Sequence, residues 1–169
     1  MSCLLLCHCG IRELAYQNND FNQSEHSLDR SRPLRVDHSA IIGNNNKALW
    51  RYVLPRGSVL EGVRATVANR LATDGESWTR VFSRYNSGTY NNQWMVVDNK
   101  LFTPHQEQLT DGLLWVLEQI PGYLRRQDLT ETLQSRTFWP SYNSPYFPGL
   151  PLPLLVSASS RQISLFRRF

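Results

Sequence analysis

A ten-residue stretch without a formal charge, residues 85–94, constrains the fold of this chain most strongly. Its sequence, YNSGTYNNQW, is dominated by amide and hydroxyl side chains, and it leads directly into the apolar residues 95–97. Amides and hydroxyls held against a buried strand must satisfy their hydrogen bonds within the protein or bind a ligand. The stretch therefore predicts either a polar turn leading into a core strand or part of a binding surface.

The length and composition are those of one globular domain. The chain has 169 residues, of which 41% are hydrophobic and 19% are charged, which is enough for a proper core. The net charge is +4, but Arg161, Arg167 and Arg168 lie in the C-terminal segment and the rest is dispersed. A nucleic-acid binder is expected to carry a basic stripe on its folded part. The sequence therefore predicts no nucleic-acid partner.

The cysteines all lie near the N-terminus, as Cys3, Cys7 and Cys9, with His8 among them. They lack the second paired half that zinc sites show, so we expect an unpaired tail, with no metal and no other cofactor. The apolar residues 4–6 are far too few to span a membrane, and no basic residue precedes them as in a signal peptide. Residues 22–24, NQS, form a glycosylation sequon, which matters only in the secretory pathway.

Three helices are predicted from periodicity and capping. Residues 58–61 have the form of a capping box, and Leu60, Val63, Val67 and Leu71 follow at helical spacing, which predicts a helix over 59–72. The same spacing predicts a second helix from about Trp78 to residue 86. Another capping-box pattern at 128–131 predicts a third, ending near residue 135. We expect the apolar stripes of the first two helices to pack in the core.

Two strands are predicted to be buried on both faces, because residues 93–97 and 113–117 are apolar runs without alternation. Residues 118–122 are expected to close the second strand in a turn. Strands among amphipathic helices indicate an α+β fold with a layered core. We predict an unpatterned arm over 1–37, the core segment over 38–148 and a divergent tail over 149–169.

The chemistry of the polar segments is that of neutral donors beside aromatic walls. Such donors suit an oxyanion hole, because they stabilise a developing negative charge without a proton of their own. An amide is neither a nucleophile nor a general base. No Gly-rich phosphate loop, paired-histidine motif or G-x-S-x-G elbow occurs in the sequence. The residues therefore predict the stabilising half of an acyl-transfer site without its attacking half.

Four motifs in order resemble the phospholipase B-like family, over about residues 41–148. They are the helix with SVLE at 58–61 and VANRLA at 67–72, NSGTYNNQW at 86–94, EQIPG at 118–122 and WPSYN at 139–143. The resemblance implies a partial αββα sandwich of the N-terminal nucleophile hydrolase type, in which a cysteine exposed by autoproteolysis attacks an acyl carbonyl. It also implies a phospholipid or N-acyl substrate, and a lysosomal or secreted glycoprotein active in lipid degradation.

The same resemblance implies the site residues. Asn143 matches the family's active-site asparagine and would be the oxyanion-hole donor. Supporting residues beside it are expected to be Asn86, Thr89, Asn91, Asn92 and Trp94.

The chain also departs from the family pattern. The family's nucleophilic cysteine precedes the matched region, a Glu-Thr-Thr run is replaced at residues 39–41 by SAI, and no counterpart of a later active-site arginine follows residue 148. The first hypothesis is therefore a hydrolase segment that lacks its nucleophile and is inactive alone. The alternative is a non-catalytic, truncated product that associates with other chains of the family protein through exposed sheet surfaces. A third hypothesis is binding of anionic surfaces by the Arg-rich C-terminus.

Overall fold

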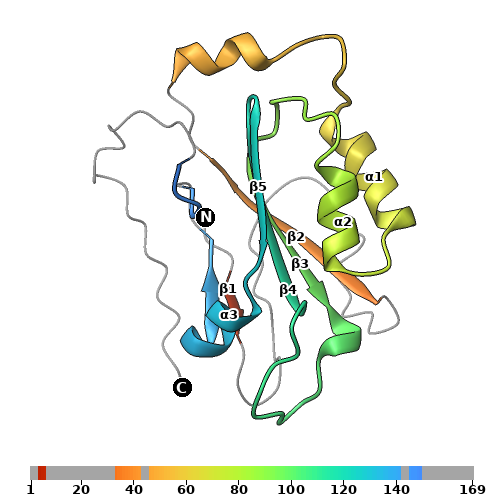
Figure 1. The fold of residues 1–169 in the computed structure, drawn as a ribbon, viewed down its shortest axis with the longest axis vertical. Coiled ribbons are helices and arrows are strands. Elements are labelled where there is room, and N and C mark those ends of the chain that lie inside the picture. The colour runs from red at the N-terminus through yellow and green to blue at the C-terminus, as the bar shows by residue number, and fades with distance from the viewer. Residues whose placement is uncertain (1–3, 7–32, 43–45, 142–144, 150–169) are drawn as a thin grey trace.

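The structure, a computed structural model, describes residues 4–6, 33–42, 46–141 and 145–149, and every structural statement concerns these. A four-stranded antiparallel sheet has the order β2 (Leu34–Ile41), β3 (Asn92–Asp98), β4 (Leu114–Ile120) and β5 (Tyr123–Asp128). A separate pair joins β1 (Leu4–Leu6) to β6 (Phe138–Pro140). With its helices, the chain is α+β, as predicted (Figure 1).

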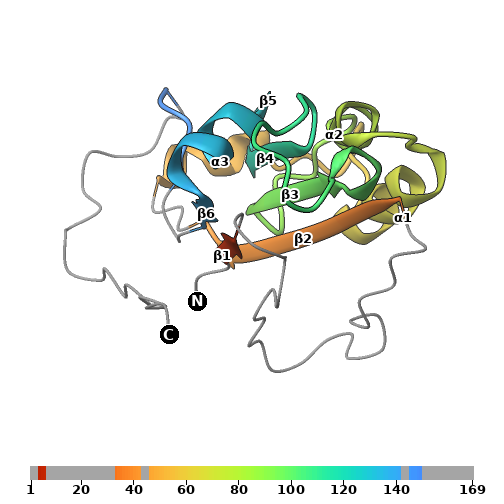
Figure 2. The same cartoon turned by 90° about the horizontal axis from the view of Figure 1, so that it is seen from below.

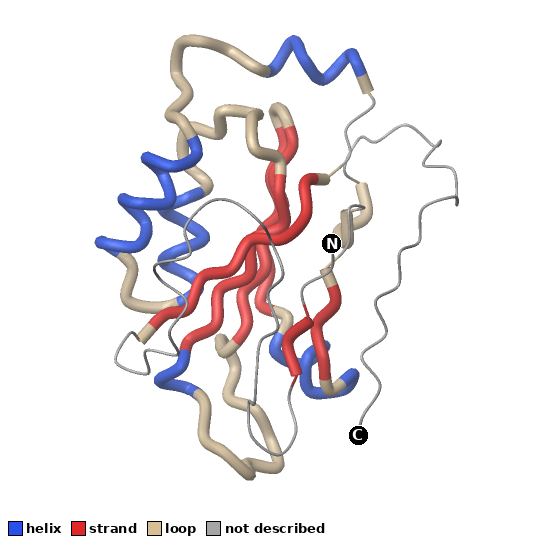
Figure 3. The backbone as a smooth tube through the Cα atoms, turned by 180° about the vertical axis from the view of Figure 1, so that it is seen from behind, coloured by secondary structure: helices blue, strands red, loops and turns tan. Residues whose placement is uncertain are grey.

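Helices cover the sheet from both sides. One face carries α1 (Glu61–Leu71) and α2 (Gly75–Phe82). On the other side lie α3 (Thr130–Arg136) and β6, as Figures 1 and 2 show. The 3-10 helix η1 (Lys47–Tyr52) lies beyond one end of the strands in Figure 3, and η2 (Asn99–Leu101) follows β3. None of the described helices is long and apolar enough to cross a membrane.

The central strand β3 is buried along its whole length. Trp94 and Val96 lie in a core with α1 and α2, which contribute Ala68, Trp78 and Phe82. Met95 and Val97 lie in a second core together with Leu133 of α3 and Trp139 of β6. Alternate side chains of a strand point to opposite faces, so one apolar run serves both cores. The predicted strand, buried on both faces, is confirmed.

The second predicted strand is also present, but it is longer than predicted. The turn expected from residue 118 begins only after Ile120, so Glu118 and Gln119 lie within β4 and are fully buried. The turn itself uses Gly122, with a φ of 74°, where a Cβ atom would lie 2.5 Å from the ring of Tyr52. Two polar residues thus extend a buried strand instead of ending it.

The outer strands β2 and β5 were not predicted. β5 alternates between exposed and half-buried residues and contains Arg125 and Arg126, so it lacks the apolar run that identifies a buried strand. β2 begins at Leu34, within the residues predicted to be an unpatterned arm. It pairs with β3 along one edge, so the partner strand, not its own composition, orders it.

The helix over 59–72 is confirmed as α1, but the predicted buried face is wrong. The apolar residues Leu60, Val63, Val67 and Leu71 are exposed, whereas Arg64 and Ala68 are buried. A guanidinium with enough partners can occupy an interior position, and here its hydrogen bonds turn α1 so that the apolar stripe faces outward.

Neither predicted capping box forms as a reciprocal pair of bonds, although Asp128 Oδ1 accepts from the Thr130 N–H (2.9 Å) at the start of α3. Leu60 and Leu129 are the N-caps of α1 and α3, and neither makes a side-chain capping bond. A reciprocal box instead opens α2, where the Asp74 carboxylate accepts from the Ser77 backbone N–H and the Ser77 side chain interacts with the Asp74 backbone. These bonds fix the entry of α2, which begins and ends earlier than the predicted helix. Trp78, Val81 and Phe82 pack in the core as predicted, but Tyr85, the last member of the predicted stripe, lies beyond α2 and is exposed.

Val96→Ala and Val67→Ala should differ sharply in their effect on stability. Val96 is fully buried, so its truncation should lower the free energy of unfolding by about 2 kcal/mol through lost burial and a residual cavity. Val67 is exposed, and its truncation should change that energy by less than about 0.5 kcal/mol. Urea denaturation followed by tryptophan fluorescence measures both. Equal losses would contradict the outward placement of the stripe.

Candidate functional site

The uncharged stretch forms a turn that is fastened to the end of the β4–β5 hairpin. Asn86 donates from Nδ2 to the Ile120 carbonyl (2.9 Å), and its Oδ1 accepts from the Gly88 N–H (2.8 Å). Gly88 has a φ of 67°, and a Cβ atom there would lie 3.0 Å from the Cα of Pro121. The motifs at 86–94 and 118–122 are therefore in direct contact, and only glycine fits between them.

On the helix side of the sheet, the buried guanidinium of Arg64 joins four segments. Its Nη1 donates to the Phe82 carbonyl (2.7 Å), its Nη2 to Gln119 Oε1 (2.7 Å) and its Nε to the Val59 carbonyl (3.0 Å). The guanidinium also lies 4.4 Å from the centre of the Phe82 ring. Burial lowers its pKa, and no described carboxylate forms an ion pair with it. Its hydrogen-bond acceptors are neutral, and the charge of Glu61 opposes the effect of burial on the pKa.

The Gln119 side chain connects Arg64 to the turn of residues 86–91. Its Oε1 accepts from Arg64, and its Nε2 donates to the Thr89 carbonyl (2.9 Å). The Thr89 hydroxyl donates to Ser87 Oγ (3.0 Å), which also accepts from Arg64 Nη2 at 3.4 Å. The polar atoms of the turn are thus mostly used internally, as a brace.

Two buried acceptors in the stretch remain unused. Asn91 donates from Nδ2 to the Gly88 carbonyl (3.1 Å). Its Oδ1 and the Oδ1 of Asn92 are buried and accept no hydrogen bond from any described residue. Trp94 is a core residue, with its ring centre 4.7 Å from that of Phe82 and 5.7 Å from that of Trp78. Among the predicted supporting residues, only Asn91 and Asn92 therefore have buried side-chain oxygens left to accept a further donor.

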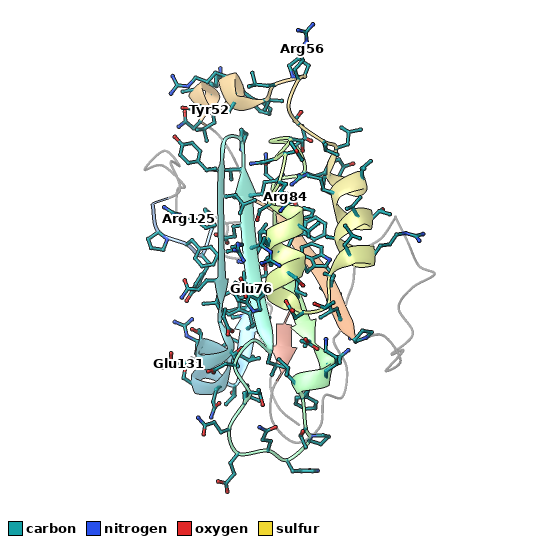
Figure 4. The ribbon with its side chains drawn as sticks, turned by 45° about the vertical axis from the view of Figure 1, so that its right-hand side comes forward. Tyr52, Arg56, Glu76, Arg84, Arg125 and Glu131 are labelled. Atoms are coloured by element: carbon teal, nitrogen blue, oxygen red, sulfur yellow. The ribbon has the colours of Figure 1, made fainter. Side chains whose placement is uncertain are left out.

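On the opposite face of the sheet, the buried carboxylate of Glu118 holds residues 145–149. Its Oε1 accepts from Gln93 Nε2 (2.7 Å) and the Tyr146 N–H (2.7 Å), and its Oε2 accepts from the Phe147 N–H (3.0 Å). Arg125, its partner across the β4–β5 pair, is exposed and projects away from α2 (Figure 4). No described cation forms an ion pair with Glu118. Burial raises its pKa, against the opposing effect of these three bonds.

Gln93 connects the same carboxylate to the WPSYN motif. While its Nε2 bonds Glu118, its Oε1 accepts from the Trp139 indole N–H at 3.1 Å. Glu118 and Gln93 therefore fasten the chain on both sides of residues 142–144. Sequence reasoning missed both residues as site residues. The signal was present, because a Glu and two Gln within otherwise apolar strands need buried partners.

Some of the predicted residues are not placed by the structure. Asn143, the expected oxyanion-hole donor, lies outside the described residues, as do Cys3, Cys7 and Cys9. Of the supporting residues, the turn brings Asn86, Thr89 and Asn91 together, and Asn92 begins β3. The part of the chain that is described contains no group of three or more His, Cys, Asp or Glu that could hold a metal ion.

These features define an α+β protein whose four sequence motifs are joined by hydrogen bonds to residues of the two central strands, β3 and β4. A family model described as Phospholipase B matches residues 26–151. The chain belongs to the phospholipase B family, and the match extends beyond the residues 41–148 that carried the resemblance.

Curated relatives agree with this assignment. The chain is 57% identical over 106 residues to "Putative phospholipase B-like 2" of Mus musculus, covering 63% of this chain and 18% of that protein. The values for the Homo sapiens protein of the same name are identical. The Dictyostelium discoideum "Phospholipase B-like protein G" is 46% identical over 109 residues, covering 62% of this chain and 18% of that protein. The match spans about a fifth of the length of these relatives.

Arg64→Met should destabilise the chain strongly. The substitution leaves the buried acceptors Gln119 Oε1 and Phe82 O without a donor, so we expect a loss of about 3 kcal/mol in the free energy of unfolding. The matched control is Arg70→Met, on the exposed side of the same helix, which should stay within about 0.5 kcal/mol. Chemical denaturation measures both, and a mild effect at Arg64 would show that its bonds are dispensable.

Glu118 should make stability depend on pH. Its folded-state pKa lies above its ordinary value of 4.5, so the folded chain keeps a proton that the unfolded chain loses above that pH. The free energy of unfolding should therefore fall as pH rises from 4.5 through the raised pKa. Glu118→Gln should remove this component of the profile. Glu131→Gln, on the exposed side of α3, should keep the wild-type profile, and parallel profiles for all three proteins would contradict the assignment.

Proposed function

We propose that this chain is the framework segment of an N-terminal nucleophile hydrolase that cleaves acyl bonds. The observation that carries the proposal is the convergence of all four family motifs on β3 and β4. Arg64, in the helix that carries the first motif, binds Gln119, Asn86 binds the Ile120 carbonyl, and Trp139 binds Gln93. A constellation held by buried bonds from several elements is how enzymes keep an oxyanion donor in place before the reaction.

In this proposal Asn143 donates its amide N–H to the oxyanion that forms when a nucleophile attacks the carbonyl of an ester or amide. The attacking cysteine comes from a part of the family protein that precedes the matched region. A phospholipid or an N-acyl compound is the substrate class, in keeping with the name of the family. No cofactor is needed, because the cysteine's own α-amino group would serve as the base.

Asn91 and Asn92 support an incomplete site. Their buried Oδ1 atoms receive no donor from the described residues, and a buried acceptor without a partner costs about 1 to 3 kcal/mol. Donors from the remaining part of the family protein would remove this cost. Asn86 and Thr89 would then support the site indirectly, because their hydrogen bonds hold the turn that contains Asn91.

The location proposed for the whole family protein is the lysosome or the extracellular space. This proposal rests on family membership alone. A secreted or lysosomal product would be able to carry a glycan at the sequon of residues 22–24.

A non-catalytic product that associates with other chains is the second candidate. One observation favours association as such, namely the exposed apolar residues of α1. Both faces of β3 are covered by described residues, so the sheet surfaces left for association are at the edge strands β2 and β5. Association through α1 is compatible with either candidate.

The purified chain alone should hydrolyse neither phospholipid nor acyl-amide substrates, because the proposal places the nucleophile elsewhere. Release of fatty acid from phosphatidylcholine vesicles and from an N-acyl amide measures this directly. The informative variants are Asn143→Ala and a form in which Cys3, Cys7 and Cys9 are all changed to Ser. Turnover that is lost in the first variant and kept in the second would contradict the missing nucleophile.

A further inference from the structure

The apolar stripe of α1 is a feature of the described surface that the proposed chemistry does not use. Leu60, Val63, Val67 and Leu71 have exposed fractions of 71, 53, 41 and 66%. Residues spaced by three, four and seven lie on one flank of a helix, so these four side chains form a continuous strip. Contiguous exposed apolar surface is typical of an interaction site.

The stripe points away from the rest of the described helical layer. On the opposite flank of α1, Asn69 Oδ1 accepts from the Trp78 indole N–H at 2.7 Å, so α2 occupies that side. Beneath α1, Ala68 shares a core with Leu34 and Val36 of β2, which is an edge strand of the described sheet. Figure 1 shows α1 as the outermost helix of this layer. The stripe therefore lies where the helical layer would continue.

We propose that the stripe is the docking face for an apolar element from the part of a phospholipase B family protein that lies outside this chain. The inference rests on the proposed function in one respect, that this segment works together with the remainder of the family protein. The length of the relatives supports the occupant, since about four fifths of each lies outside the match. An element there would extend the layer of α1 and α2 beyond the edge of β2.

The chemistry of the stripe defines the occupant more closely. Its four exposed side chains are aliphatic, so the facing element presents aliphatic or aromatic side chains. Arg70 lies three residues after Val67 and is exposed, so it borders the strip with one positive charge. A carbonyl or carboxylate of the occupant beside Arg70 would complement it.

Cysteine labelling at two neighbouring positions tests this proposal. Val67→Cys and the matched control Thr66→Cys are made in this chain, and cysteines are placed at the two aligned positions of the complete mouse relative. Thr66 is exposed on a different flank of α1, and both changes are nearly isosteric. The rate of modification by a maleimide is followed for each thiol by peptide mass spectrometry, which separates it from the native cysteines.

In the isolated chain both thiols should react rapidly. In the complete relative, the thiol at the position of Val67 should react at least about tenfold more slowly, since a covered thiol reacts only when the contact opens. The control thiol should react at about the same rate in both proteins. Rapid labelling at both positions of the relative overturns the proposal, and so does equal protection of both. Protection that grows with the concentration of the isolated chain, or that appears only with anionic phospholipid vesicles, assigns the stripe to another occupant and also overturns it.

These outcomes are independent of hydrolysis. If the complete relative cleaves no acyl substrate while its thiol at the position of Val67 is protected, the proposed function fails and the docking face stands. If it cleaves substrate while that thiol reacts freely, the docking face fails and the proposed function stands.

Discussion

A buried positive charge whose hydrogen-bond acceptors are neutral decides how the helical side of this protein is assembled. Arg64 cannot be left without acceptors inside a core, so α1 must place it over the Phe82 carbonyl and Gln119 Oε1 at the same time. That requirement fixes the rotation of α1 about its axis, the position of the end of α2 and the side chain of β4. The outward direction of Leu60, Val63, Val67 and Leu71 is a consequence of the same requirement.

Glu118 and Gln119, the two polar residues at the end of β4, bind segments on opposite faces of the sheet. Gln119 points to the helices and binds the turn that follows α2, whereas Glu118 points to the other core and binds the chain after β6. Because consecutive residues of a strand face opposite sides, one dipeptide joins segments from both layers. The two central strands therefore form the common anchor for the turn at 86–91 and for the segments that flank residues 142–144. Burial raises the pKa of the Glu118 carboxyl, and its three hydrogen bonds act in the opposite direction.

Sequence reasoning predicted what depends on local pattern. The apolar runs of β3 and β4 and the helical spacing of α1 and α2 identified the elements and the α+β class, and the motifs identified the family. Sequence reasoning failed where the structure of one segment depends on its contacts with another. β5 is polar by itself and becomes a strand only by pairing with β4, and a stripe that looks like core on α1 is displaced by Arg64. The predicted supporting residues Asn86 and Thr89 lie in the braced turn, but Glu118 and Gln93 needed tertiary partners to be seen. The position of Asn143 remains a prediction.

The turn of residues 85–91 belongs to the rigid core and is not a loose surface loop. Native-state hydrogen exchange at low denaturant concentration tests it most directly. The Gly88 N–H, bonded to Asn86 Oδ1, and the Val59 N–H, bonded to the Tyr85 carbonyl, should exchange only with the same global unfolding that exposes Val96. Exchange of these two amides through a separate, low-energy opening, while Val96 stays protected, would contradict the account.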